Sequence, residues 1–192
     1  MNLAVFASGR GSNFLAIAGR MRESRDHELS CMICDRKAAL VMDRARELGV
    51  PAHHVSYKDR PREEAERQIV SILERYRVDL IALAGFMKLF TPYFLRAFHG
   101  PILNLHPALL PKYPGAHGIE ESYASGDPEL GITVMEIDEG TDTGPILLQK
   151  SFRRGAGEGI AEIEERIHAL EHEWYPKAVL DRLDALGAGR RP

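Results

Sequence analysis

Two kinds of hydrophobic pattern alternate along the first 105 residues of the chain. Short, continuously apolar runs are typical of strands that are covered on both faces. Between them lie stretches whose apolar residues recur every three or four positions, as in amphipathic helices. The predicted strands span 2–8, 27–35, 51–57, 78–86 and 100–106, and the predicted helices span 14–24, 38–49, 62–77 and 92–99. This alternation predicts a parallel sheet with crossover helices.

The remainder of the chain has a different pattern. Segments 131–137 and 145–153 alternate apolar and polar residues around a turn-rich stretch, which predicts an antiparallel hairpin at the edge of the sheet. A long helix is expected over 160–186, and the last six residues, 187–192, are expected to be frayed. We therefore predict the α/β class, with a mostly parallel twisted sheet, an antiparallel C-terminal hairpin and a long terminal helix. The absence of repeats and linkers favours one domain over residues 1–192.

Composition and charge narrow the possible functions. The 192 residues are 44% hydrophobic and 28% charged, with a net charge of -3 and a pI of about 6.2, which disfavours general nucleic-acid binding. No run is long enough for a membrane span, and no export signal is evident, so we expect a cytoplasmic protein that does not associate with membranes.

The two cysteines, Cys31 and Cys34, lie three positions apart on a predicted strand. Residues at that spacing point to opposite faces of a strand, so we expect buried reduced thiols rather than a redox pair or a metal site. Reduced thiols agree with a cytoplasmic location.

Three turn segments follow the carboxyl ends of predicted parallel strands, where open α/β sheets bind ligands. The first, "SGRGSN" at 8–13, places two glycines before a helix, and a helix N-terminus favours anions. An anion site and a simple turn capped by Ser12 or Asn13 are equally compatible with this pattern. The dinucleotide fingerprint is incomplete, because Phe14 occupies the position of its third glycine.

Asn104 and His106 end the fifth predicted strand and share one of its faces. An amide can donate to a developing oxyanion, and an imidazole can transfer protons near neutral pH. Three prolines then stiffen the loop 107–114. The structural alternative is that Asn104 caps the strand and His106 packs under the loop.

A carboxylate from the predicted hairpin loop is the third candidate. Asp142 lies between two threonines, just before the second hairpin strand, where it could keep His106 charged or orient a water. By composition alone, Asp138 and Glu139 are equally possible. No GxSxG or HExxH motif is present, and His168 and His172 lack a third ligand, so no metal is expected. These residues indicate transfer at a small carbonyl carbon without a covalent enzyme intermediate.

Several longer motifs resemble one family. "FASGRGSN", "LAGFMKLFT", "NLHPALLPKYPGAHG", "GITV", "DTGPILLQ" and "EHEWYP" occur in this order and are similar to the folate-dependent formyl-transfer family, in its glycinamide ribonucleotide branch. The resemblance implies a Rossmann-like formyltransferase fold. It also implies transfer of a formyl group from the co-substrate 10-formyltetrahydrofolate to the amine of glycinamide ribonucleotide, in purine (IMP) biosynthesis.

The resemblance also implies a role for particular residues. The catalytic residues would be Asn104, His106 and Asp142. The residues that bind the ribonucleotide would be Gly11, Ser12, Asn13, His168 and Glu171. The residues that bind the folate would be Arg62, Met87, Lys88, Leu89, Phe90, Asn104, Asp138, Glu139, Gly140, Thr141 and Asp142.

Parts of the same sequence are compatible with other functions. Another 10-formyltetrahydrofolate enzyme, either a hydrolase or a methionyl-tRNA formyltransferase core, is the nearest alternative, but each carries a further domain for which this chain has no matching segment. A non-catalytic nucleotide-binding or folate-binding module need not keep Asn104, His106 and Asp142 together. We expect only small-molecule partners, and the sequence is compatible with a monomer or a homodimer.

Overall fold

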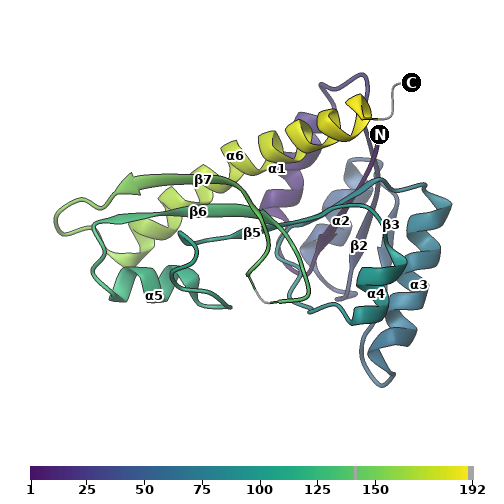
Figure 1. The fold of residues 1–192 in the computed structure, drawn as a ribbon, viewed down its shortest axis with the longest axis horizontal. Helices are drawn as coiled ribbons and strands as arrows, with labels where there is room; N and C mark the ends of the chain where they lie inside the picture. The colour runs from purple at the N-terminus through teal and green to yellow at the C-terminus, as the bar shows by residue number, and fades with distance from the viewer. Residues whose placement is uncertain (141, 190–192) are drawn as a thin grey trace.

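One mixed sheet organises the computed structural model, which describes residues 1–140 and 142–189 (Figure 1). Its strand order is β3-β2-β1-β4-β5-β6-β7. The strands are β1 (Asn2–Ala7), β2 (Glu28–Cys34), β3 (Ala52–His54), β4 (Leu80–Leu83), β5 (Ile102–His106), β6 (Glu129–Glu136) and β7 (Ile146–Arg153). The helices are α1 (Ser12–Met21), α2 (Leu40–Glu47), α3 (Arg62–Arg75), α4 (Pro92–Ala97), α5 (Gly118–Ala124) and α6 (Ile160–Ala188).

The strand directions confirm the predicted fold class. Strands β1 to β5 pair in parallel, whereas β6 pairs antiparallel with both β5 and β7. Figure 1 shows the β6–β7 hairpin extending away from the parallel strands, with α6 running along it. All four residues of β4 are buried, as its continuous apolar run predicted.

Helices cover both faces of the sheet. On one face, a core cluster combines apolar side chains from α1, α2 and α6. On the other face, a second cluster combines those from α3 and α4. Cys31 and Cys34 are buried and unpaired, as predicted, and burial raises the pKa of Cys31 to about 12.

Three features of the fold differ from the prediction. Helix α5 was missed, because its buried positions are Gly118 and Ser122, which give no apolar stripe. Helix α1 begins at Ser12 rather than at position 14. Helix α6 continues to Ala188, so two of the residues expected to be frayed are helical, while residues 190–192 lie outside the described residues.

One buried tyrosine connects α6 to the centre of the sheet. The hydroxyl of Tyr175 lies 3.0 Å from the carbonyl oxygens of both Leu83 in β4 and Leu103 in β5. These strands lead directly into the segments 84–91 and 107–115. Within residues 1–140 and 142–189, no helix combines the length and apolar character that a membrane crossing requires.

Candidate active site

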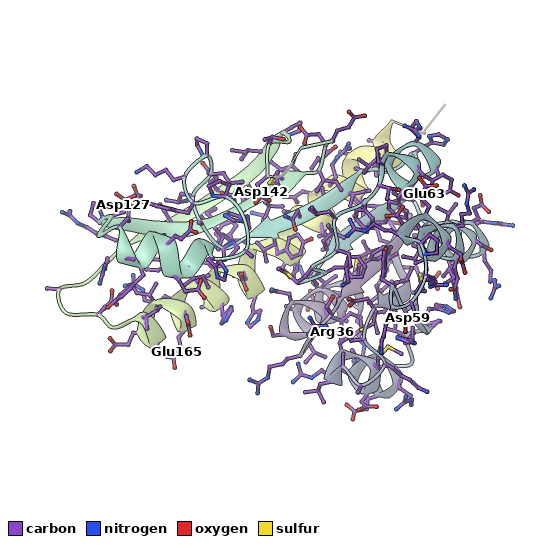
Figure 2. The ribbon with its side chains drawn as sticks, turned by 90° about the horizontal axis from the view of Figure 1, so that it is seen from below. Arg36, Asp59, Glu63, Asp127, Asp142 and Glu165 are labelled. Carbon is purple, nitrogen blue, oxygen red and sulfur yellow. The ribbon has the colours of Figure 1, made fainter. Side chains whose placement is uncertain are left out.

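Asn104, His106 and Asp142 meet at the carboxyl end of β5, although the last two are 36 positions apart in the sequence. The Nδ2 group of Asn104 donates to Oδ1 of Asp142 at 3.4 Å, and Nδ1 of His106 lies 3.6 Å from Oδ2 of Asp142. The side chains of His106 and Asp142 are only 3% and 10% exposed. Figure 2 labels Asp142 near the middle of the molecule, whereas Asp127 and Glu165 lie toward one end.

The contacts of the His106 ring determine where its hydrogens lie. Its Nε2 atom is 2.7 Å from the carbonyl oxygen of Tyr113. A carbonyl can only accept, so Nε2 carries a hydrogen. Nδ1 then faces the Asp142 carboxylate at 3.6 Å. The geometry therefore fixes the hydrogen of Nε2 and directs Nδ1 toward the carboxylate.

The backbone around Asp142 brings its carboxylate toward the strand end. Asp142 has a φ of 54°, in the left-handed region that aspartate adopts more readily than most residues. Its Oδ2 atom accepts from the N–H of Gly115 at 2.8 Å. Gly144, two residues further on, has no space for a Cβ, which would overlap the carbonyl oxygen of Glu136. This turn directs the carboxylate toward Asn104 and His106. Its hydrogen bonds offset the conformational strain of the left-handed backbone.

The proline-rich loop after β5 is fastened to the hairpin. The N–H of Leu110 donates to Oγ1 of Thr133 at 3.0 Å, and that hydroxyl donates to the Ala108 carbonyl at 2.7 Å. The amide of Gln149 donates to the Leu110 carbonyl at 2.8 Å. Gly118 then packs so closely on the His106 ring that an added Cβ would lie 3.1 Å from Nε2. The imidazole is therefore confined from several sides.

A second group of predicted residues gathers where α1 begins. Nδ2 of Asn13 donates to Oε2 of Glu171 at 3.0 Å, and Nδ1 of His168 is 2.9 Å from the same oxygen. The hydrogen bond to Glu171 raises the pKa of His168. Gly11 has a φ of 79°, and an added Cβ there would overlap Val41. Helix α6 thus meets the glycine loop, residues 8–13, although the two are far apart in the sequence.

Polar atoms at the glycine loop are without partners. The side-chain oxygens Oγ of Ser8 and Oδ1 of Asn13 are buried and have no hydrogen-bond partner within the described residues. Buried polar atoms of this kind are uncommon in folded proteins, and a bound ligand would satisfy them. The Ser8 hydroxyl could donate to an anion at the nearby N-terminus of α1, whereas Oδ1 of Asn13 can only accept and suits a ligand hydroxyl.

The segment 87–91 has exposed apolar side chains and an anchored backbone. Met87 and Leu89 are both 63% exposed, which is unusual for large hydrophobic residues. Arg62 donates to the Leu89 carbonyl at 3.0 Å, and Nζ of Lys88 lies 3.6 Å from Oδ2 of Asp35. None of the N–H groups of residues 87–90 donates to a backbone carbonyl within the described residues. These donors are free for a ligand.

One residue that anchors this segment was not predicted. Glu66 in α3 is fully buried, and its carboxylate accepts from both the N–H and the hydroxyl of Thr91. Its spacing in the sequence could have indicated that it is buried, because Glu66 lies three and seven residues before the buried Ile69 and Leu73 on the same face of α3. A carboxylate on an apolar helix face indicates a specific buried partner.

The remaining predicted residues lie in the hairpin loop 137–145, between β6 and β7. The carboxylate of Asp138 accepts from the hydroxyl of Thr143 and the N–H of Gly140, and these bonds lower its pKa. Asp138 and Glu139 line an open cavity of about 510 Å³, whose lining does not include Asn104, His106 or Asp142. Thr141 lies outside the described residues. Of the three loop acids, Asp142 is therefore the one in contact with His106.

Histidine, cysteine and acidic side chains are common ligands of metal ions in proteins. Among the described residues, no group of three or more histidine, cysteine, aspartate or glutamate side chains could hold a metal ion. The rings of His168 and His172 stack with their centroids 6.3 Å apart.

Comparisons with known proteins agree on one family. The family model described as formyl transferase matches residues 1–179. The phosphoribosylglycinamide formyltransferase of Bacillus subtilis (strain 168) is 40% identical over 190 residues, which cover 98% of this chain and 97% of that protein. A trifunctional purine biosynthetic protein of Drosophila pseudoobscura pseudoobscura is 37% identical. That match covers 98% of this chain but only 14% of the longer Drosophila protein.

Solved structures lead to the same family. The crystal structure of glycinamide ribonucleotide transformylase 1 from Geobacillus kaustophilus superposes with a TM-score of 0.88 at 43% identity. The match covers 95% of this chain and 97% of that one.

Proposed function

The chain belongs to the formyl transferase family, and we propose that the cluster of Asn104, His106 and Asp142 is where it carries out its reaction. The reaction moves a formyl group from 10-formyltetrahydrofolate to the amine of glycinamide ribonucleotide, in purine biosynthesis. Its products are formylglycinamide ribonucleotide and tetrahydrofolate. The observation that carries the assignment of the site is the convergence of an amide, a buried imidazole and a carboxylate at the end of β5.

The first chemical step needs a stabilised negative charge. The amine nitrogen attacks the formyl carbon, a C–N bond forms, and the formyl oxygen becomes an oxyanion. The Asn104 amide would donate to this oxygen, and a charged His106 would stabilise it through its positive charge, because its Nε2 hydrogen already points to the Tyr113 carbonyl. Asp142 would keep His106 charged, because a carboxylate 3.6 Å away favours the second ring hydrogen.

The second step needs proton transfer. The attacking amine must lose a proton, and the folate nitrogen must gain one as its bond to the formyl carbon breaks. Asp142 and His106 would relay these protons through water, in keeping with their positions beside one another. No covalent enzyme intermediate and no metal is needed for this sequence.

The two substrates would bind on opposite sides of this cluster. The ribonucleotide phosphate and ribose would lie against Gly11, Ser12 and Asn13, with His168 and Glu171 as further contacts, supported by the buried unpaired oxygens there. The folate would lie against residues 87–90 and the hairpin loop, supported by the free N–H groups and the exposed Met87 and Leu89. Arg62 would act in part through the Leu89 carbonyl that it holds.

Further properties are part of the same proposal. Residues 1–192 would act as a single formyltransferase domain in the cytoplasm, as a monomer or a homodimer, with no nucleic-acid or membrane partner. The family match over residues 1–179 and the continuous seven-stranded sheet support the single domain.

A spectroscopic assay tests the reaction and its acceptor together. Purified protein is mixed with 10-formyltetrahydrofolate, with and without glycinamide ribonucleotide, and loss of the formyl group is followed. Loss only in the presence of the ribonucleotide is the expected result. Equal loss in its absence would mean that the site delivers water to the formyl carbon. No loss in either mixture would indicate a binding module instead of an enzyme.

A further inference from the structure

Tyr113 holds the catalytic histidine through its backbone while its own backbone is strained. Its carbonyl accepts from Nε2 of His106 at 2.7 Å, and its φ is 56°. A bulky residue in the left-handed region is a rare and unfavourable arrangement. Other contacts must therefore keep Tyr113 in this conformation.

The side chain of Tyr113 supplies such contacts. Its hydroxyl donates to Oδ2 of Asp127 at 2.6 Å and lies 2.8 Å from Oγ of Ser125. Nζ of Lys112 lies 2.9 Å from the same oxygen of Asp127. The hydrogen bonds from Lys112 and Tyr113 lower the pKa of Asp127, so it is a carboxylate and a strong acceptor at neutral pH.

Packing does not replace these hydrogen bonds. A cavity of about 300 Å³ lies between the loop and the segment that connects α5 to β6, and its lining includes Leu110, Tyr113, Asp127 and Leu130. Apolar close packing is incomplete on this side of the loop. The hydrogen bond to Asp127 therefore restrains the Tyr113 ring on a side where packing is incomplete.

The same few residues also contact the other catalytic group. The N–H of Gly115, two residues after Tyr113, donates to the Asp142 carboxylate at 2.8 Å. Movement of Tyr113 would therefore change the contacts of His106 and Asp142 together.

We propose that Tyr113 and Asp127 form a tether that positions His106 for the reaction. The Asp127 carboxylate holds the Tyr113 hydroxyl, the strained backbone then presents its carbonyl to Nε2, and Nδ1 is left facing Asp142. Tyr113 and Asp127 are positioning residues, because they act on the chemistry only through His106. This inference rests on the proposed function for its kinetic consequences and on geometry alone for the orientation of His106.

The decisive variant is Tyr113→Phe, which removes the hydroxyl and leaves the backbone carbonyl. We expect kcat to fall between about tenfold and a hundredfold, as for small displacements of a catalytic group. The KM values for both substrates should change little, because the tether contacts neither binding segment. Asp127→Asn keeps an acceptor atom but loses the charge, so its kcat should lie between those of Tyr113→Phe and the wild type.

Tyr123→Phe is the matched control. The Tyr123 hydroxyl, on the neighbouring helix α5, donates to the Glu158 carbonyl at 3.4 Å, which lies outside the loop 107–115. Its kcat should stay within about twofold of the wild type, as for most changes away from buried networks. An equal loss in both tyrosine variants would mean a general structural effect and would overturn the tether.

A measurement on His106 itself separates this inference from the proposed function. In protein labelled with ¹⁵N-histidine, with the His106 signals assigned by their loss in His106→Ala, NMR reports which ring nitrogens carry hydrogens. We expect a protected Nε2 hydrogen in the wild type, and one that exchanges faster in Tyr113→Phe and in Asp127→Asn. Unchanged signals and a kcat close to the wild type would overturn the tether. If the wild-type protein transferred no formyl group, the proposed function would fail, and the NMR result would still decide the tether.

Discussion

At the residue scale, the proposed chemistry depends on His106 and Asp142 as a pair. His106→Ala removes the buried imidazole, and Asp142→Asn removes the charge while keeping a residue type that tolerates a φ of 54°. Each change should lower kcat by about 10²–10⁴, the usual contribution of a general acid or base, with the fold retained. His117→Ala, at an exposed position in the same motif, is the control for steady-state kinetics and circular dichroism. A near-wild-type rate in either of the first two variants would place the reaction elsewhere.

The pair His168 and Glu171 makes a prediction about pH. The hydrogen bond to Glu171 raises the pKa of His168 above its unfolded value. The resulting stabilisation is fully present below the unfolded pKa, about 6.5, and is lost as the pH rises through the higher folded value. His168→Gln should therefore lower the melting temperature more at about pH 5.5 than at about pH 8. The effect should be small, because the His168 side chain is 53% exposed and solvent screens it. His172→Gln is the control, and equal losses at both pH values would contradict the argument.

At the element scale, α3 supports the segment proposed to bind the folate. Glu66 holds Thr91, whose hydroxyl in turn accepts from the N–H of Phe94 at the start of α4. Glu66→Ala would remove the acceptor of the half-buried Thr91 N–H and hydroxyl, at a cost of about 1–3 kcal/mol in unfolding free energy. It should also raise the KM for 10-formyltetrahydrofolate more than it lowers kcat, because the substrate-binding backbone loses its anchor.

Two further variants test this prediction. Glu66→Gln keeps one acceptor and should recover part of both losses, while Glu63→Ala, at an exposed position on the first turn of the same helix, should change neither. Urea unfolding and steady-state kinetics measure the two effects separately. A Glu66→Ala variant that lost stability but kept its KM would show that the anchor does not reach the binding segment.

The elements themselves were predictable where burial leaves a periodic pattern. The parallel strands and α3 stand out because their buried side chains are apolar and regularly spaced. Helix α5 has glycine and serine at its buried positions, so no pattern marks it. The contacts of Glu66 and of Tyr113 could not be predicted either, because hydrogen bonds between segments 14 to 25 residues apart depend on tertiary structure and not on spacing. The proximity of Asn104 and His106 could be predicted from the sequence, because both lie on one face of a short strand.

At the scale of the whole molecule, α6 connects both proposed substrate sites to the sheet. Its first half carries His168 and Glu171 to the glycine loop, and its second half joins the hairpin through an ion pair between Arg182 and Glu136 at 2.6 Å. Between them, Tyr175 reaches the carbonyls of β4 and β5. A single helix thus contacts the glycine loop, the end of β4 and β5, and holds them in fixed positions relative to one another.

Tyr175→Phe tests how much this central contact contributes. The hydroxyl is buried and hydrogen-bonded, so its loss should cost about 1 kcal/mol of unfolding free energy. In a protein of this size, that corresponds to a fall of about 2–4 °C in melting temperature. Tyr57→Phe is the matched control, since the Tyr57 hydroxyl is buried without a partner in the described residues, and removing it should be neutral or stabilising. Equal destabilisation in both variants would mean that loss of a buried hydroxyl as such, and not loss of the bonds to β4 and β5, causes the effect at the centre of the molecule.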